Sequence, residues 1–356
     1  MRTRFAVVTL SLAGLILPGQ LLSAQQGDAG RQSGPWWAYS FFTPPAPGEA
    51  ARECGDPPVS CANPRPVPQV EETPRSLPGA PRQYSRKQAS EWFGPADWYP
   101  DDHPPMPDVV ARGNEQTGVR ACSLCHSPLG KGRSENASVV GLPVPYFIQQ
   151  MAEFKNGNRR SADPRKLNTK EMIAMAKALS DEEVRAAAEY YGSMKFTSRL
   201  GRIVETDTVP KVRGLGSLFV PEEGGGTEPL GQRIIEVPEN PDATEWLRDP
   251  KTRWIIYVPK GSVARGASLV NAGTATNPDG ATTPGRTVQC GVCHGTDLRG
   301  IGNVPGIAGR SPSYLVRQLY DMQQGTRNSP MMKAVVANLT DDDFVTIGAH
   351  LASLEP

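Results

Sequence analysis

The chain lacks an excess of charge of either sign, and after its first two dozen residues it lacks long apolar runs. Lysine and arginine together number 38 and aspartate and glutamate 37 among 356 residues. No basic run stands out, which argues against a nucleic-acid partner. No later stretch reaches the roughly 20 apolar residues that a membrane helix needs. The length leaves room for two or three domains.

The N-terminal segment is typical of an export signal. Two arginines precede an apolar run that ends near Leu22, and Ser23 with Ala24 forms a small-residue cleavage site. We expect residues 1–24 to be a signal peptide, with a retained anchor as the alternative. The mature protein should then be exported and carry no stable membrane span.

Cysteine is scarce, and four of the six cysteines fall in two short clusters. The other two, Cys54 and Cys61, lie in the loop-like stretch ECGDPPVSC. In an oxidising compartment such a pair predicts a disulfide. Free thiols, or a metal or haem ligand role, are the alternatives.

Proline is concentrated near the N-terminus, where residues 25–110 hold 17 of the chain's 35 prolines. Proline disfavours helix, so residues 25–105 are expected to form an extended, turn-rich arm. Tryptophan and phenylalanine are interleaved in PWWAYSFF and EWFGPADWYP. We expect these aromatics to be buried against the globular part. A partner-docking or membrane-interface segment is the alternative.

An internal repeat dominates the rest of the chain. A shift of 168 carries ACSLCH at residues 121–126 onto QCGVCH at residues 289–294. The same shift carries Tyr146, Gln150 and Arg159 onto Tyr314, Gln318 and Arg327. After the arginine the first copy gains eight residues, and the shift becomes 160. Two copies of one domain are predicted, at residues 106–197 and 262–356.

Each copy has helical signals. In the first, PYFIQQMAEFKNG ends in glycine, and SDEE at residues 180–183 is a capping box that opens the last helix. In the second, Ser311 before a proline and Thr340 predict N-caps. Further helices are predicted before each cluster, at 109–114 and 262–271, which share the tripeptide Ala-Arg-Gly. Between the copies, residues 198–261 contain three β-branched and aromatic runs, which predict a small inserted sheet.

The two clusters have the pattern Cys-x-x-Cys-His. Each offers three ligands, one short of a structural zinc site. The histidine that directly follows the second cysteine marks the attachment site of a c-type haem. Two thiols at i and i+3 face the same way on a helical turn. They can form thioethers with one porphyrin edge while the imidazole reaches the iron. We therefore expect two covalently bound haem c groups, held by Cys122, Cys125, Cys290 and Cys293, with His126 and His294 as iron ligands.

The other iron ligand separates an electron carrier from a catalyst. A methionine thioether closes the iron and raises its potential. The repeat aligns Met172 with Met332, which makes them the predicted ligands. Met175 and Met331 compete, although Met175 aligns with Val335 and Met331 with Glu171. Core packing is the alternative role for each.

These motifs, with a Tyr-x-x-x-Gln helix, a late methionine and Leu-Ser-Asp-Glu, resemble class I c-type cytochromes over residues 111–197 and 264–354. The tandem arrangement is similar to dihaem bacterial electron carriers. The resemblance implies a mainly α fold with two tandem haem domains, to which the β insert (198–261) and the proline-rich arm are added. It also implies periplasmic electron transfer to redox partner proteins, a dehydrogenase or a terminal oxidase. In that family a proline carbonyl often accepts a hydrogen bond from the histidine, and Pro305 or, in the first copy, Ala137 would supply it.

Other residues have simpler expected roles. His103 is expected in a loop and His350 in packing or at the surface, although an axial role for His103 is an alternative. The recurring tyrosines are expected to pack between helices, and Arg159 and Arg327 can contact haem propionates. The protein is expected not to be an enzyme. A fixed cytochrome subunit of a dehydrogenase complex is one alternative, and a dihaem peroxidase or sulfur-compound dehydrogenase is another.

Overall fold

The computed structural model describes residues 34–49, 72–215 and 218–356. The expected signal peptide at residues 1–24 and the pair Cys54 and Cys61 lie outside these ranges. Within them, no helix has the length and apolar character that crossing a bilayer requires.

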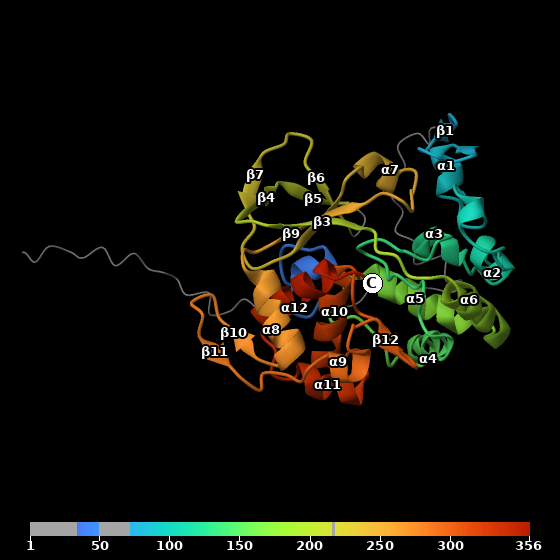
Figure 1. Ribbon diagram of the computed structural model, residues 1–356. Coiled ribbons are helices and arrows are strands. Elements are labelled where there is room, and N and C mark those ends of the chain that lie inside the picture. Colours follow the sequence, from blue (N-terminus) through green and yellow to red (C-terminus); the bar gives the residue numbers. More distant parts are fainter. Residues whose placement is uncertain (1–33, 50–71, 216–217) are drawn as a thin grey trace, which may run out of the picture. The chain divides into compact units, whose positions relative to one another are not determined.

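Helices surround the first cysteine cluster (Figure 1): α2 (Asp108–Ala111), α3 (Cys122–His126), α4 (Val144–Lys155), α5 (Leu167–Ala178) and α6 (Asp181–Ser193). Helix α4 packs against both α5 and α6. The predicted capping box of α6 is confirmed. The Ser180 hydroxyl accepts a hydrogen bond from the Glu183 amide at 3.2 Å, and the Glu183 carboxylate accepts one from the Ser180 amide at 2.9 Å. The capped helix presents Val184, Ala187 and Tyr191 to a shared core.

A second set of helices surrounds the second cluster: α8 (Ser262–Ala272), α9 (Gly291–His294), α10 (Pro312–Gln323), α11 (Pro330–Val336) and α12 (Asp341–Ser353). Helix α12 packs against α8 and α10. Ser311 and Thr340 cap α10 and α12 as predicted, each accepting a hydrogen bond at 3.2 Å from an amide three residues on. Two short antiparallel ribbons join this set, β10 (Ala275–Thr276) with β11 (Thr282–Thr283) and β12 (Gly300–Ile301) with β13 (Val304–Pro305).

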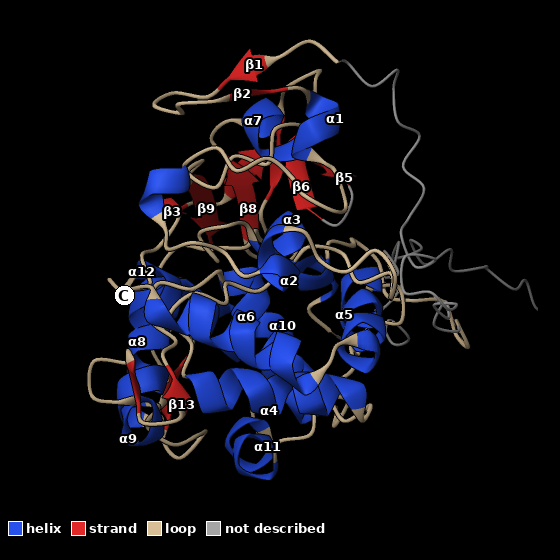
Figure 2. Ribbon diagram, turned by 90° about the vertical axis from the view of Figure 1, so that its right-hand side faces the viewer, coloured by secondary structure: helices blue, strands red, loops and turns tan. Residues whose placement is uncertain are grey.

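The segment between the two helix sets contains the predicted sheet. Strand β3 (Leu200–Glu205) pairs parallel with β9 (Trp254–Val258), which pairs antiparallel with β8 (Ile235–Pro238). All three correspond to the predicted runs. Two small ribbons that the sequence did not predict pair β4 (Thr208–Pro210) with β7 (Thr227–Pro229) and β5 (Val212–Leu215) with β6 (Leu218–Pro221). A short helix, α7 (Pro241–Glu245), completes the segment. Figure 2 shows the longer strands grouped together on one side of the helices.

The proline-rich arm is less extended than expected. It forms the 3-10 helices η1 (Trp36–Tyr39) and η3 (Pro100–Asp102), the ribbon β1 (Arg75–Ser76) with β2 (Gln83–Tyr84), and α1 (Arg86–Ala89).

The arm's aromatics divide into buried and exposed ones. Trp37 and Tyr39 are buried in the same core as α10 and α12, and the Tyr39 hydroxyl donates to Asp321 at 2.6 Å. Trp98 is buried and donates from Nε1 to the Leu247 carbonyl at 2.7 Å. Phe42 is 51% exposed, contrary to expectation. Its ring stacks on Phe219 at 4.9 Å between centroids, and the Arg233 guanidinium lies 5.5 Å from its centroid.

Candidate haem site

A cavity of about 790 Å³ connects the two cysteine clusters. Its lining includes both predicted haem-attachment segments: Cys122, Cys125, His126, Cys290, Cys293 and His294. Apolar side chains from α4, α5, α6, α10 and α12 supply much of the remaining wall, among them Phe147, Leu179, Leu315 and Ile347. The repeat therefore brings two motifs that are 168 residues apart in the chain to one shared cavity.

The first histidine is fixed by the loop after α3. His126 Nδ1 lies 2.8 Å from the carbonyl oxygen of Ala137. A carbonyl can only accept, so Nδ1 carries the hydrogen and Nε2 keeps its lone pair. Burial lowers the pKa of His126, which keeps the ring neutral. A neutral imidazole with a free Nε2 is the form that coordinates a metal.

The second histidine repeats this arrangement. His294 Nδ1 lies 2.8 Å from the carbonyl oxygen of Pro305, which the β12–β13 ribbon presents. Burial also lowers the pKa of His294. The sequence-based expectation for both carbonyl partners is confirmed. The first copy has Ala137 where the second has Pro305, and the hydrogen bond from the histidine has the same length in both copies.

The four clustered cysteines lie beside these rings. They are free thiols in the structure, three of them partly buried and Cys293 exposed. Burial raises the pKa of Cys122 to about 12 and that of Cys290 to about 11.

Six methionines line the cavity. They are Met151, Met322 and the four candidates from the sequence, Met172, Met175, Met331 and Met332. The predicted ligands Met172 and Met332 are both partly buried and pack against the cores of their own copies. Met175 is buried, whereas Met331 is 81% exposed. Because all four reach the cavity, the choice of Met172 and Met332 stays a prediction.

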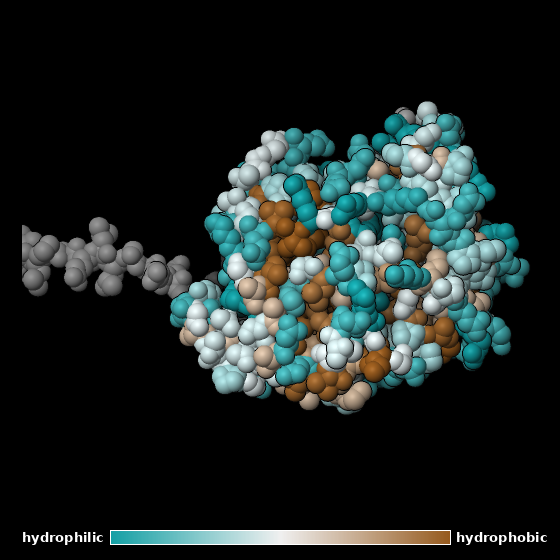
Figure 3. Space-filling model, viewed as in Figure 1, coloured by the Kyte–Doolittle hydropathy of each residue, from teal (hydrophilic) through white to brown (hydrophobic). Residues whose placement is uncertain are grey.

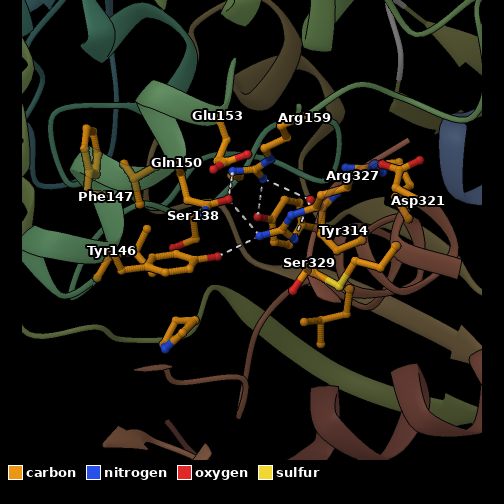
Figure 4. A pocket seen from close by; sticks show the side chains of 18 of the residues that line it. Ser138, Tyr146, Phe147, Gln150, Glu153, Arg159, Tyr314, Asp321, Arg327 and Ser329 are labelled. Atoms are coloured by element: carbon orange, nitrogen blue, oxygen red, sulfur yellow. Dashed lines mark hydrogen bonds between the residues drawn. The ribbon is translucent and has the colours of Figure 1, made fainter. Parts of the chain in front are cut away.

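A symmetric hydrogen-bonded cluster joins the two copies beside the cavity (Figure 4). It consists of the tyrosine, glutamine and arginine that recur in the repeat: Tyr146, Gln150, Arg159, Tyr314, Gln318 and Arg327. The Arg159 guanidinium donates to Tyr314 Oη at 3.2 Å and to Gln318 Oε1 at 2.9 Å. The Arg327 guanidinium donates to Tyr146 Oη at 2.8 Å and to Gln150 Oε1 at 2.9 Å. Each arginine also bonds the glutamine of its own copy at 2.9 Å.

The recurring tyrosines were expected only to pack between helices, so their partners are a correction. The sequence showed which residues recur but not that they contact each other across the repeat. The segments carrying the arginines also pair through an antiparallel bridge, in which the Asn328 amide donates to the Asn158 carbonyl at 2.7 Å.

Three buried basic side chains that line the cavity show whether its surroundings suit a haem. Arg159 and Arg327 are 9% and 6% exposed, and neither forms an ion pair with a carboxylate in the described ranges. Lys166 is 3% exposed and its Nζ has no hydrogen-bond partner among the described residues, while burial lowers its pKa well below the usual value. An apolar cavity bordered by buried cations suits an apolar ring that carries carboxylates, as a porphyrin does. Sequence reasoning missed Lys166, although the eight-residue gain of the first copy contains it.

The two remaining histidines do not line the cavity. His103 lies in the arm, where Nδ1 is 2.8 Å from the Pro104 carbonyl and Nε2 is 3.1 Å from Asp97 Oδ1. His350 is buried on α12. These positions agree with the simpler expected roles.

No family model matches the chain. Cytochrome c4 of Pseudomonas aeruginosa is 36% identical over 76 residues, which are 21% of this chain and 38% of that protein. A thiosulfate dehydrogenase electron acceptor of Stutzerimonas stutzeri is 32% identical over 69 residues, 19% of this chain and 32% of that protein. Cytochrome c-554(548) of Halomonas halodenitrificans is 31% identical over 81 residues, 22% of this chain and 98% of that protein. The chain belongs to the cytochrome c family.

Covalently bound haem c is the cofactor of this cytochrome. The chain spans only about a third of the length of the first two of these relatives. Among solved structures, thiosulfate dehydrogenase from Marichromatium purpuratum is similar, with a TM-score of 0.44 and 22% identity over 70% of this chain and 39% of that chain.

Proposed function

We propose that this cytochrome is a periplasmic dihaem protein that passes single electrons between redox partners. The observation that carries the proposal is the repeated histidine arrangement. Both rings donate from Nδ1 to a backbone carbonyl at 2.8 Å, and both line one cavity. Two equivalent metal-binding positions at one shared cavity suit relay of electrons better than binding of a bulky substrate.

The chain's own residues have distinct roles in this proposal. Cys122 and Cys125 hold one porphyrin through thioethers, and Cys290 and Cys293 hold the other. His126 and His294 each bind iron through Nε2. Met172 and Met332 would supply the second protein ligand of each iron. Bound haem c supplies a one-electron ferric–ferrous couple. A methionine ligand leaves no open position for a substrate, so the protein itself makes and breaks no bonds.

We also propose the domain organisation expected from the repeat, with haem domains at 106–197 and 262–356, the arm at 25–105 and the β insert at 198–261. Equivalent helices support it: α3 and α9 carry the clusters, α4 and α10 the recurring tyrosines, and α6 and α12 the capping boxes. Residues 1–24 would be the export signal.

A second candidate is a permanently bound cytochrome subunit of a dehydrogenase. It is favoured by a relative named as the cytochrome subunit of sulfide dehydrogenase, from Chlorobaculum tepidum, which is 31% identical over 68 residues, 19% of this chain and 62% of that protein. Purification of the tagged protein from its native host distinguishes the two candidates. A dehydrogenase retained in stoichiometric amount through gel filtration supports the fixed subunit, and a protein that elutes alone supports the carrier. A terminal oxidase is the other class of redox partner that the carrier would serve.

The ligand assignment is tested by the variants Met172→Leu and Met332→Leu in a host that matures c-type cytochromes. Leucine has similar volume but no sulfur, so each variant should lose one low-spin His/Met signal in the EPR spectrum of the oxidised protein. The reduction potential of the affected haem should fall by on the order of 0.1 V.

Met175→Leu and Met331→Leu are matched controls and should leave both signals unchanged. Loss of a signal in a control instead would move the ligand to that neighbour. Fewer than two haems per chain by mass spectrometry of the wild type would refute the dihaem proposal.

A further inference from the structure

A second, much smaller cavity lies where the first copy, the β insert and the second copy meet. Its volume is about 20 Å³, and we call it the junction cavity. Its lining comes from the loop 131–138 of the first copy, from the strands β3, β8 and β9, and from residues 309–314 at the start of α10. The Ser198 hydroxyl donates to the Gly309 carbonyl at 2.8 Å, and the Trp254 amide donates to the Arg199 carbonyl at 3.1 Å. These two hydrogen bonds hold the insert against both strand β9 and the second copy.

The guanidinium group of Arg199, directly before β3, is the main feature of the junction cavity. Its Nε, Nη1 and Nη2 atoms are all buried, and none has a hydrogen-bond partner among the described residues. The guanidinium carbon lies 4.9 Å from the ring centroid of Trp254. The Nε1 atom of Trp254 is also buried and likewise has no hydrogen-bond partner in the described ranges. All four nitrogens are donors only, so a ligand that satisfies them must be an acceptor.

Arg199 keeps its positive charge although it is buried. Figure 3 shows hydrophilic side chains over much of the outer surface, where water can solvate them. The Arg199 guanidinium lacks this solvation, and burial lowers its pKa to about 9, which still leaves the group charged at neutral pH. The carboxylates of Glu135, Glu236 and Asp249 attract it, but none of them forms a hydrogen bond with it.

Positive charge exceeds negative charge in the lining of the junction cavity. Its basic side chains are Lys131, Arg133, Arg199 and Arg310. Among these four, and within the described ranges, Arg133 alone forms an ion pair, which joins it to Glu135 at 2.5 Å. The Arg310 guanidinium donates only to the backbone carbonyls of Gly306 and Ser138. Three cations of the lining therefore have no paired anion.

The one carboxylate in the lining does not compensate these cations. Glu236 accepts hydrogen bonds from the Ser311 hydroxyl at 2.8 Å and from the Ser313 amide at 2.6 Å. Burial and repulsion from Arg199 lower the pKa of Lys131, which means that these two cations face each other. An anion between them would remove this repulsion.

The size of the junction cavity limits what it can hold. A cavity needs roughly 10–15 Å³ to hold one water molecule. The volume of about 20 Å³ therefore leaves room for a single water or a single monatomic ion. A cation is excluded by the four basic side chains, and a water molecule would satisfy donors without reducing the charge.

We propose that the junction cavity is a halide site that binds one chloride ion. The ion accepts hydrogen bonds from the Arg199 guanidinium and from Trp254 Nε1, and its charge offsets that of Arg199 and Lys131. It holds together the first copy, the β insert and the second copy. The site does not depend on the proposed electron-transfer function.

Bromide is the probe that locates the ion. It has the charge of chloride and nearly its size, and its anomalous X-ray scattering distinguishes it from water. Crystals of the holoprotein soaked in sodium bromide should show an anomalous peak in the junction cavity, within hydrogen-bond distance of Arg199 and of Trp254 Nε1. A water at this position without an anomalous peak overturns the proposal. An equally strong peak in crystals of Arg199→Gln means an adventitious ion only, and the proposal also fails.

Thermal unfolding of the holoprotein measures binding in solution. Sodium chloride and sodium gluconate are compared at a constant ionic strength of about 0.2 M. Gluconate is too large for the junction cavity, and an ion that binds only the folded state stabilises it. The midpoint temperature should therefore be about 3 °C higher in chloride.

Two variants separate the site from the general effects of these salts on folded proteins. Arg199→Gln removes the buried charge and should lose the difference between chloride and gluconate. Arg202→Gln, at an exposed arginine of the same strand, is the matched control and should keep it. An equal difference in both variants overturns the proposal. If Arg199→Gln does not fold, Lys131→Gln replaces it and should reduce the difference, and an undiminished difference there has the same meaning.

Discussion

At the residue scale, the surroundings of two histidines outside the cavity shift their pKa values in opposite directions. The two ring nitrogens of His103 face only acceptors, the Pro104 carbonyl and the Asp97 carboxylate. Burial lowers its pKa, but these hydrogen bonds outweigh burial, and the pKa is raised. For His350, burial on α12 lowers the pKa. One ring is therefore stabilised in its charged form and the other in its neutral form.

These directions predict opposite pH dependences of stability. A raised folded-state pKa stabilises below the unfolded pKa of about 6.5, and this contribution is lost as pH rises through the folded value. A depressed pKa stabilises above about 6.5, and this contribution is lost as pH falls through the folded value. In urea unfolding of the holoprotein, His103→Asn should therefore reduce the loss of stability on the alkaline side. His350→Asn should reduce the loss on the acid side. The same change in both variants would contradict the assignment.

At the scale of the elements, helix α8 crosses α12 so closely at Gly266 that only glycine fits there. A Cβ atom added at Gly266 would lie 1.9 Å from the Thr346 carbonyl oxygen and 2.8 Å from the Cβ of His350. Both contacts are with the neighbouring helix, so relief requires the helices to separate.

Gly266→Ala should therefore destabilise the holoprotein by about 2 kcal/mol, despite the better helix propensity of alanine. Gly224→Ala is the matched control, since a Cβ there meets nothing within 4 Å. The measurement is the free energy of unfolding in urea. Equal stability of both variants would mean that α8 moves away from α12 at no cost.

The same glycine illustrates how far the elements could be predicted. The sequence predicts a helix around the tripeptide Ala-Arg-Gly in both copies. In the first copy α2 ends at Ala111 and Gly113 follows it with a φ of 69°, whereas in the second copy Gly266 lies inside α8, which continues to Ala272. Local pattern located the capped helices and the three strands β3, β8 and β9. It did not distinguish these two glycines, because the packing of α8 on α12 decides the second case.

The candidate haem site, too, could be predicted from local pattern only in part. The attachment cysteines, the histidines and the carbonyl partners Ala137 and Pro305 were predictable, because a short motif and one repeat shift carry them. The covering of the first cluster by Trp92 and Arg248 was not, because both residues lie outside the repeat and reach the cluster only through the fold. Asymmetry between the two copies is therefore a tertiary property even where the motif is identical.

At the scale of the whole molecule, the main feature is the hydrogen-bonded cluster of recurring tyrosines, glutamines and arginines that connects the two copies. We call this cluster the joint. It buries two guanidinium groups without a carboxylate partner in the described part of the chain, and burial and the nearby Arg327 lower the pKa of Arg159. Two effects compete there. Repulsion between like charges opposes the joint, and six hydrogen bonds with tyrosines and glutamines stabilise it. With porphyrin carboxylates beside the arginines, repulsion would be compensated and the hydrogen bonds should dominate.

Arg327→Leu decides which effect dominates. The substitution removes the hydrogen bonds to Tyr146, Gln150 and Gln318 and leaves buried polar groups unpaired, so it should lower the unfolding free energy of the holoprotein by about 3 kcal/mol. Calorimetry should then show two separated transitions, because the joint loses three of its six hydrogen bonds. Arg185→Leu, at an exposed arginine of α6, should leave one transition at the wild-type temperature. A more stable Arg327→Leu variant would mean that charge repulsion dominates and that no carboxylate of the bound haems reaches the arginines.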